Sequence, residues 1–360
     1  MFPKVPDQHK IGKPLVPNGL GVIYVLFTTV YLFLLYFLGV FRNPDNVSAP
    51  ISPPFTLAAC VLFGGFMGLL DDWMDLKWRY KAFMPLIAAL PLVYLASEYG
   101  LRTSISLPLI GSIQFGEAYY FLVIPLIVMI VTNAVNMLGG FNGLETLCPA
   151  ITLVGLMALS QSYLILMLGP LILWLALAAL NVRGKVFVGN TGSFAIGMTI
   201  ASFAVITDLK SSLLVSILPY IFNSALILLT IFFIRERAKI TFDGKKLVSD
   251  HRRSLVTLIT YHRPLTERQI LAIISLLLVI SILPHILNSA LILLTIFFIK
   301  AKAKVTCDGK KLVSDHRRSL VTLITYHRPL TERQVVAITS LLMVIFTTIA
   351  LLIELPWPFF

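Results

Sequence analysis

Apolar segments long enough to cross a lipid bilayer recur along this chain, and they constrain its fold more than any other feature. A helix needs roughly 20 apolar residues to span the hydrocarbon core, and only helices and closed barrels satisfy their backbone groups there. Hydrophobic residues make up 58% of the chain and charged residues 13%, which excludes a soluble domain of this length. We therefore expect an all-α polytopic membrane protein with about 9–11 transmembrane helices.

The hydropathy pattern predicts membrane spans near residues 20–41, 54–71, 82–97, 119–137, 145–160, 162–180, 192–207 and 212–234. The first of them is too long to be the apolar core of a cleavable signal. Residues 103–118 alternate in the manner of a strand around a Pro and a Gly, and they predict a small β-hairpin outside the membrane. Residues 1–360 are expected to form one integral-membrane domain.

Lys and Arg residues are distributed unequally between the two sides of these spans. With the N-terminus placed inside, the loops on that side hold 17 of them, in residues 1–19, 72–81, 138–144, 181–191 and 235–268. The opposite loops up to residue 268 hold only Arg42, Arg102 and Lys210. Cytoplasmic loops carry such an excess, so the site described below should face the cytoplasm. The net charge of +12 then indicates lipid headgroups or phosphate substrates as partners, and no nucleic acid.

A tandem repeat occupies the C-terminal part of the chain. Residues 216–280 align without gaps with residues 281–345, and 54 of the 65 positions are identical. Each copy contains the same charged loop. Residues 270–299 separate the two loops. As a single helix this apolar segment would be longer than the hydrocarbon core is thick, and as two spans each half would be short. We expect it to reverse in a hairpin at Pro284, because one straight span would place the second charged loop on the outer side. Either loop copy could fill a single cleft.

The first polar motif, DDWMDLKWRYK, follows the second predicted span. Asp71 and Asp75 share a helix face one turn apart, with Asp72 beside it. Clustered carboxylates at a membrane edge repel one another unless a cation joins them, and Mg²⁺ binds carboxylate and phosphate oxygens together. Lys81 and two further cations in this motif suit phosphate oxygens. A solvated helix end is the alternative interpretation.

Two further motifs, NAVNMLGGFNGLE and RGKVFVGNTGSFAIG, combine amides with glycines beside predicted spans. Amides at such a position are costly unless they face protein or water, and glycine lets a backbone approach a ligand closely. Ser193 could cap the helix after Asn190, and a helix start with glycines suits an anion. The second motif lacks the Gly-Lys-Ser/Thr of a Walker sequence. Interhelical hydrogen bonds and a capped turn are the alternative interpretations.

The repeated loop supplies cations next to the membrane. Its first copy contains His251, Arg252, Arg253, His262 and Arg263. A polybasic anchor for lipid headgroups would have the same composition. The two histidines are eleven residues apart, which argues against a zinc site.

In combination, these motifs resemble the polyprenyl-phosphate N-acetylhexosamine-1-phosphate transferases. That membrane family includes the eukaryotic and archaeal dolichyl-phosphate GlcNAc-1-phosphate transferases and the bacterial phospho-MurNAc-pentapeptide translocase. The resemblance runs from HKIGKPLVPNGLG (9–21) to the first HRPLTER loop. It is closer to the eukaryotic and archaeal branch, because bacterial members usually have Asp where Gly139 stands. It implies transfer of GlcNAc-1-phosphate from UDP-GlcNAc to a polyprenyl (dolichyl) phosphate at the cytoplasmic face, with release of UMP, as the first step of lipid-linked glycan assembly.

The resemblance implies a metal and phosphate site. Asp71 and Asp72 match the aspartate pair that serves the metal and the phosphates. Lys81 matches a phosphate-contacting lysine, and Asn136 matches a ligand of Mg²⁺, which Mn²⁺ can replace. Asn190 stands where the family normally has a metal-binding Asp. A neutral amide can still coordinate the cation, with less attraction.

Other matching positions imply the substrate contacts. Asn142 matches a nucleotide contact, Phe187 matches the aromatic ring that stacks on uracil, and Glu145 joins the substrate-binding set. The basic loop matches the family loop that lies on the sugar phosphate. There the resemblance gives His251 and Arg253 catalytic roles, and it gives Arg252 and His262 binding roles.

Besides Asn190, two further features of the chain depart from that family. The family begins with a span before the GKPLVP loop, so a first helix is expected to be missing here, and the 65-residue duplication is foreign to it. Two other functions therefore stay open: a transporter or flippase, and an inactive duplicate that binds nucleotide. The location would be the cell membrane in an archaeon or bacterium and the endoplasmic reticulum membrane in a eukaryote. The oligomeric state, a homodimer included, is also open.

Overall fold

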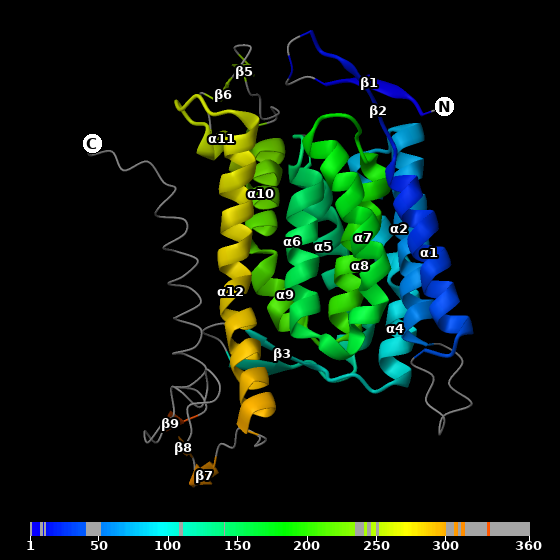
Figure 1. Ribbon diagram of the computed structural model, residues 1–360, viewed down its shortest axis with the longest axis vertical. Helices are drawn as coiled ribbons and strands as arrows, with labels where there is room; N and C mark the ends of the chain where they lie inside the picture. Colours follow the sequence, from blue (N-terminus) through cyan, green and yellow to red (C-terminus); the bar gives the residue numbers. More distant parts are fainter. Residues whose placement is uncertain are drawn as a thin grey trace.

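A computed structural model describes residues 2–7, 10, 12–40, 52–107, 111–139, 141–234, 241–242, 246–249 and 252–299, together with the strand residues 306–308, 311–313 and 330–331. The structure is a bundle of roughly parallel and antiparallel helices (Figure 1). The helices are α1 (Gly21–Phe37), α2 (Pro53–Met74), α3 (Trp78–Ala88), α4 (Leu90–Glu98), α5 (Ile124–Met137), α6 (Leu144–Leu159), α7 (Leu164–Val182), α8 (Gly189–Ile206), α9 (Lys210–Ser216), α10 (Leu218–Leu229), α11 (Leu255–Ile259) and α12 (Glu267–Ile299).

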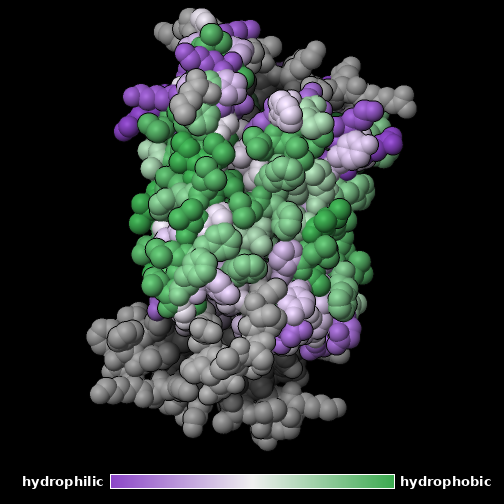
Figure 2. Space-filling view, turned by 90° about the vertical axis from the view of Figure 1, so that its right-hand side faces the viewer, coloured by the Kyte–Doolittle hydropathy of each residue, from purple (hydrophilic) through white to green (hydrophobic). Residues whose placement is uncertain are grey.

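Several of these helices are long and apolar enough to cross a membrane. Within the described residues there are five candidate spans, and up to six if the bent pair α9–α10 forms one span. The five are Pro53–Met74, Trp78–Glu98 (α3 with α4), Tyr119–Met137, Gln161–Val182 and Gly189–Ile206. α1 and α6 are apolar but shorter, at 17 and 16 residues. On the face that Figure 2 shows, apolar residues form a broad band, with hydrophilic residues at its upper end and at the lower right. The prediction of an all-α polytopic membrane protein is confirmed.

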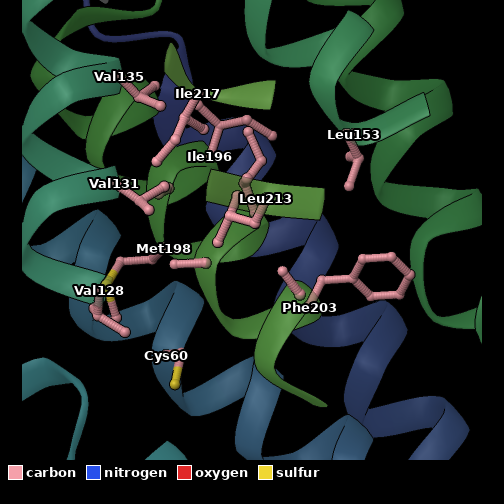
Figure 3. Close-up of a cluster of buried hydrophobic side chains, with 14 of the residues drawn as sticks. Cys60, Val128, Val131, Val135, Leu153, Ile196, Met198, Phe203, Leu213 and Ile217 are labelled. Carbon is pink, nitrogen blue, oxygen red and sulfur yellow. The ribbon is translucent and has the colours of Figure 1, made fainter. Parts of the chain in front are cut away.

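α8 lies at the centre of the bundle and is almost entirely buried. It packs against α2, α5 and α1. Figure 3 shows how its side chains meet those of neighbouring helices in one apolar cluster, whose labelled members are Cys60, Val128, Val131, Val135, Leu153, Ile196, Met198, Phe203, Leu213 and Ile217. Because α8 contacts most of the other helices, its position fixes theirs.

Glycines allow the helices around α8 to approach closely. A Cβ atom on Gly68 of α2 would lie 2.2 Å from the carbonyl oxygen of Asn190, and one on Gly64 would lie 2.5 Å from Met198. A Cβ atom on Gly21 of α1 would lie 2.2 Å from the backbone of Gly192. Small residues spaced four apart are a common helix interface in membranes, because packing rather than the hydrophobic effect joins helices there. This contact brings the end of α2 against the start of α8.

Short antiparallel hairpins cover both ends of the bundle (Figure 1). β1 (Lys4–Pro6) pairs with β2 (Leu15–Pro17), and β5 (Thr241–Phe242) pairs with β6 (Leu247–Val248). These two hairpins lie at what we call the site end. β3 (Ser104–Leu107) pairs with β4 (Gly111–Gln114) at the opposite, far end, so the hairpin expected in residues 103–118 is confirmed.

Two of the three expected outer-side cations form an ion-pair cluster at the far end. The Arg102 guanidinium lies 3.0 Å from a carboxylate oxygen of Asp208, and the Lys210 ammonium lies 2.7 Å from the other. Lys210 also donates to the Arg102 carbonyl and lies 4.3 Å from the centre of the Tyr119 ring. These cations therefore join the β3–β4 hairpin to the start of α9.

The expected hairpin at Pro284 is wrong. α12 continues through Pro284 as one helix of 33 residues. A proline inside a helix removes one hydrogen bond and introduces a kink, whereas a reversal would leave several backbone groups to be satisfied in an apolar setting. As a result, strands β7 (Thr306–Asp308), β8 (Lys311–Val313) and β9 (Leu330–Thr331), which belong to the second repeat, lie beyond the far end (Figure 1).

The close contact between α2 and α8 yields a stability prediction. We expect Gly68→Val to lower the free energy of unfolding by about 1–3 kcal/mol, because the new side chain meets backbone and cannot displace it. Thermal melting in detergent micelles should show the change. Phe66→Ala, at a position of α2 that is 57% exposed, is the matched control and should melt near wild type. Equal melting temperatures for the two variants would contradict the packing described here.

Candidate active site at one end of the bundle

The polar motifs of the sequence converge at the site end. Helices α2 and α5 end there, α3, α6 and α8 begin there, and the first copy of the repeated loop lies over α10 (Figure 1). Helix termini leave backbone N–H and C=O groups without partners in the helix. Each motif therefore satisfies backbone groups as well as presenting side chains.

Asp71 and Lys81 form the most buried ion pair of this region. The Asp71 side chain is 1% exposed and its Oδ1 lies 2.7 Å from the Lys81 ammonium. The same oxygen accepts a hydrogen bond from the backbone of Leu76 at 3.0 Å. Its Oδ2 is buried and accepts no hydrogen bond within the part of the chain that the structure describes. Lys81 also lies 3.7 Å from the fully exposed Asp75. Asp71 thus holds the ammonium group and keeps one oxygen available.

Asp72 binds the first turn of α8. Its Oδ1 accepts from the backbone of Asn190 at 2.9 Å, and its Oδ2 accepts from the backbone and hydroxyl of Thr191 at 2.9 and 2.7 Å. A carboxylate is favoured at a helix N-terminus, where N–H groups and the helix dipole carry positive charge. Gly189 has a φ of +71°, and a Cβ atom there would lie 2.8 Å from Oδ2. Glycine therefore permits both the turn and the contact.

α5 and α6 contribute to the same cluster. The Ser193 hydroxyl donates to Asn136 Oδ1 at 2.6 Å. Asn133 donates to the carbonyl of Ala82 at 3.1 Å and so joins α5 to α3. Glu145 accepts from the backbone of Val188 at 3.4 Å. The expected metal positions Asp72, Asn136 and Asn190 are thereby all linked to the first turn of α8.

Asn142 connects three separate segments. Its side chain donates to Asp7 of the N-terminal hairpin at 2.9 Å and to Glu267 of α12 at 3.0 Å, and its backbone N–H donates to Glu267 at 2.7 Å. Lys10 lies 3.1 Å from Asp7. Glu267 precedes the apolar stretch of α12. Burial raises the pKa of its carboxyl group, and the bonds from Asn142 oppose that shift. Sequence reasoning gave Asp7 and Glu267 no role.

Phe187 lies in a backbone segment bound to the N-terminal region. Its N–H donates to the Pro17 carbonyl at 2.8 Å, and its carbonyl accepts from Leu20 at 3.1 Å. The ring is partly exposed. Buried Asn181 holds this segment by donating to the Val186 carbonyl at 2.9 Å and accepting from the backbone of Gly143 at 2.7 Å. Sequence reasoning also missed Asn181, whose signal was an amide at the end of an apolar span.

The first copy of the repeated loop presents its cations from a folded segment. The Arg252 guanidinium lies 4.1 Å from the centre of the Tyr261 ring, which packs against His262 at 4.2 Å. Ser254 caps α11 in a capping box with Thr257. His251 and the other copy of the loop from residue 314 to 329 lie outside the described residues. Arg253 is described, next to Ser254.

The donor set suits a hard cation. In the described ranges, no group of three or more His, Cys, Asp or Glu side chains has a metal-binding arrangement. The available groups are instead the free Oδ2 of Asp71 and amide oxygens. Mg²⁺ needs few protein ligands, because it keeps several waters and binds substrate phosphates. Carboxylate and amide oxygens at this site therefore fit Mg²⁺ and do not suit a softer metal.

Comparison with known proteins finds a family match and several relatives. Residues 54–208 match the family described as Glycosyl transferase family 4. One similar protein, from Saccharolobus solfataricus, carries the provisional name UDP-N-acetylglucosamine–dolichyl-phosphate N-acetylglucosaminephosphotransferase. It is 28% identical over an alignment that covers 74% of this chain and 82% of its own length. The Schizosaccharomyces pombe protein named for that activity is 27% identical over 61% of this chain and 59% of its own length. A Streptococcus agalactiae phospho-N-acetylmuramoyl-pentapeptide-transferase is 27% identical over 67% of this chain and 74% of its own length.

The Asp71–Lys81 pair gives a testable prediction. Lys81→Met should leave a buried carboxylate without its cation and lower the free energy of unfolding by about 1–3 kcal/mol. This loss is smaller than for a fully buried pair, because the Lys81 side chain is 27% exposed. Adding Asp71→Asn should recover part of the loss, which a double-mutant cycle of melting temperatures would show. Asp75→Asn is the control: Asn tolerates the φ of +46° at this position, and the variant should melt near wild type. Strictly additive losses would argue against the pair.

Proposed function

Residues 54–208 match glycosyl transferase family 4, and on that premise we propose that the chain transfers GlcNAc-1-phosphate from UDP-GlcNAc to a polyprenyl phosphate, with release of UMP. It is a membrane glycosyl-1-phosphate transferase, as the resemblance in its motifs predicted. We further propose a dolichyl phosphate acceptor, because two relatives carry that substrate in their names. The excess of Lys and Arg in the loops of residues 1–268 supports a cytoplasmic site end.

The observation that carries this proposal is the meeting of acidic, amide and cationic side chains from separate helices at the site end. Asp71 and Asp72 come from α2, Lys81 from α3, Asn136 from α5 and Asn190 from α8. Such a set can bind a diphosphate, because it offers a cation and hydrogen-bond donors to phosphate oxygens. Its position at the edge of the apolar band would let a lipid phosphate and a soluble nucleotide reach the same place.

The residues of the site have two kinds of role: some fix the position of other polar groups, and others are proposed to bind the substrates. Asp71 fixes the Lys81 ammonium, whose exposed side can contact a phosphate oxygen. Asp72 fixes the start of α8 and with it Asn190. Ser193 orients the Asn136 amide. The Phe187 ring and Asn142 are proposed to bind the uridine, and the loop cations Arg252, Arg253 and His262 are proposed to bind the sugar phosphate, with His251 of the same loop.

The reaction is a displacement at phosphorus. An oxygen of the lipid phosphate forms a bond to the β-phosphorus of UDP-GlcNAc, and the bond from that phosphorus to the bridging oxygen breaks. UMP leaves with the electron pair. The lipid phosphate is largely ionised near neutral pH, so the step needs no strong base. Positioning and charge neutralisation supply most of the acceleration in phosphoryl transfer.

We propose Mg²⁺ as the cofactor, with Mn²⁺ as a substitute. The oxygens of Asp71, Asp72, Asn136 and Asn190 are those that would hold it. When bound, the cation would neutralise charge on the diphosphate. Asn190 leaves this set with one negative charge fewer than an aspartate would provide, so we expect binding to be weaker at that position.

Activity of the purified protein tests the proposal. With UDP-GlcNAc, dolichyl phosphate and Mg²⁺, wild type should release UMP, and Asp72→Ala should be slower by at least about 100-fold, because the anchored first turn of α8 is lost from the site. Glu98→Ala, at the end of α4, is the control and should retain activity. A transporter would release no UMP. Binding of UDP-GlcNAc without turnover would identify an inactive protein, and full turnover by Asp72→Ala would refute the site.

Removal of divalent cations provides an independent test. Treatment with EDTA should abolish UMP release, because two phosphates and nearby carboxylates would then repel one another. Addition of excess Mg²⁺ should restore it, and Mn²⁺ should restore part. Isothermal titration of Mg²⁺ into the protein with UDP-GlcNAc present gives a second readout. Activity that survives complete chelation would contradict the cofactor assignment.

A further inference from the structure

One buried amide joins the first copy of the repeated loop to the bundle. Asn223 of α10 is 2% exposed. Its Oδ1 accepts a hydrogen bond from the backbone of Leu255 at 2.9 Å, at the start of α11. Its Nδ2 donates to the carbonyl of Met137 at 3.1 Å, at the end of α5. Asn223 thus connects the loop to the residue that follows Asn136.

Both groups that Asn223 satisfies belong to helix ends. The Leu255 N–H lies in the first turn of α11 and the Met137 carbonyl in the last turn of α5, and neither end can be completed within its own helix. Thr230, two turns after Asn223, lies 3.5 Å from the Arg253 carbonyl through its hydroxyl. α10 and the turn that follows it therefore contact the basic loop over the stretch from Arg253 to Leu255.

The repeat supplies an internal comparison. Asn288 is the counterpart of Asn223, and both stand in the sequence NSALILLTIFFI. The first copy follows a break of 56° between α9 and α10, which directs α10 to the site end. The second copy continues along α12 as a single helix, and the strands that follow it lie beyond the far end (Figure 1). Within the part of the chain that the structure describes, the first copy starts from a helix packed against α5, and the second copy starts on α12.

We propose that Asn223 is a positioning residue that holds the first loop copy at the active site through its described residues 252–268, so that this copy alone serves the reaction. This inference rests on the proposed function for the role of the loop cations, but the contact itself does not. Arg252 and His262 stand on the segment that Asn223 anchors. A residue that acts only through the placement of such cations should affect the binding of the sugar nucleotide more than the chemical step.

The experiment compares Asn223→Leu with Asn288→Leu in the full-length protein. Leucine is close to asparagine in size, and the two sites have the same downstream sequence. We expect Asn223→Leu to raise KM for UDP-GlcNAc about tenfold and to change kcat less than about threefold, because loop contacts are made in the ground and transition states alike. Trypsin cleavage after Arg252 or Arg253 should become about tenfold faster, since the buried Leu255 N–H loses its acceptor. Asn288→Leu should change neither.

Asn223→Asp tests the contact more finely. It keeps an acceptor for the Leu255 N–H, so it should retain more of the protection from trypsin than Asn223→Leu does. If Asn223→Leu fails to fold, Leu255→Pro removes the same N–H without altering α10, at a helix position that tolerates proline. Leu255→Ala is its control, because it loses the side chain and keeps the N–H. Equal cleavage of Leu255→Pro and Leu255→Ala would overturn the proposal.

The remaining outcomes are also decisive. Unchanged KM and cleavage in Asn223→Leu, or an equal effect of Asn288→Leu, would overturn the assignment of the loop copy. A change confined to kcat would overturn the positioning role. If wild type releases no UMP, the proposed function fails. The trypsin comparison still tests the anchor in that case, because cleavage does not depend on turnover.

Discussion

The hydrogen bonds from the start of α8 to Asp72 are the interaction on which the rest of the site depends. A helix that begins inside a bundle exposes N–H groups that water reaches poorly, and they need an acceptor. Here a carboxylate from α2 accepts from Asn190 and Thr191. That arrangement requires the close approach permitted by Gly68. The same contacts therefore stabilise the bundle and define where the polar groups meet.

Much of the fold followed from the sequence, because hydropathy alone decides which segments can enter a bilayer. The expected span at 119–137 ends where α5 ends, and the hairpin at 103–118 formed as its alternation indicated. The motif around Asp71 and that around Asn190 were expected at one membrane edge from the alternation of the loops. The structure brings both to the first turn of α8. Whether they bind the metal and the substrate remains a prediction.

Contacts between distant segments could not be predicted in the same way. Nothing in the local sequence pairs Asn142 with Asp7 and Glu267, because each residue stands in a different polar stretch. Pro284 shows a related limit. Pro219 and Pro284 occupy equivalent repeat positions, yet a bend precedes the first and a continuous helix includes the second. The preceding segments differ, and tertiary packing decides between a kink and a break.

The two copies of the loop also show why a duplication of this kind can leave a site intact. The second copy repeats the loop cations, and Asn288 repeats Asn223. An asparagine can hold the loop at the site only where the carbonyl of Met137 is within reach. The carbonyl of Met137 is at the site end, and α10 reaches it because the chain bends before Leu218. The second unit, which begins at Ser281, continues the chain along α12, away from that carbonyl. The repeated residues include none of α2, α3, α5 and α8, whose side chains form the site described above.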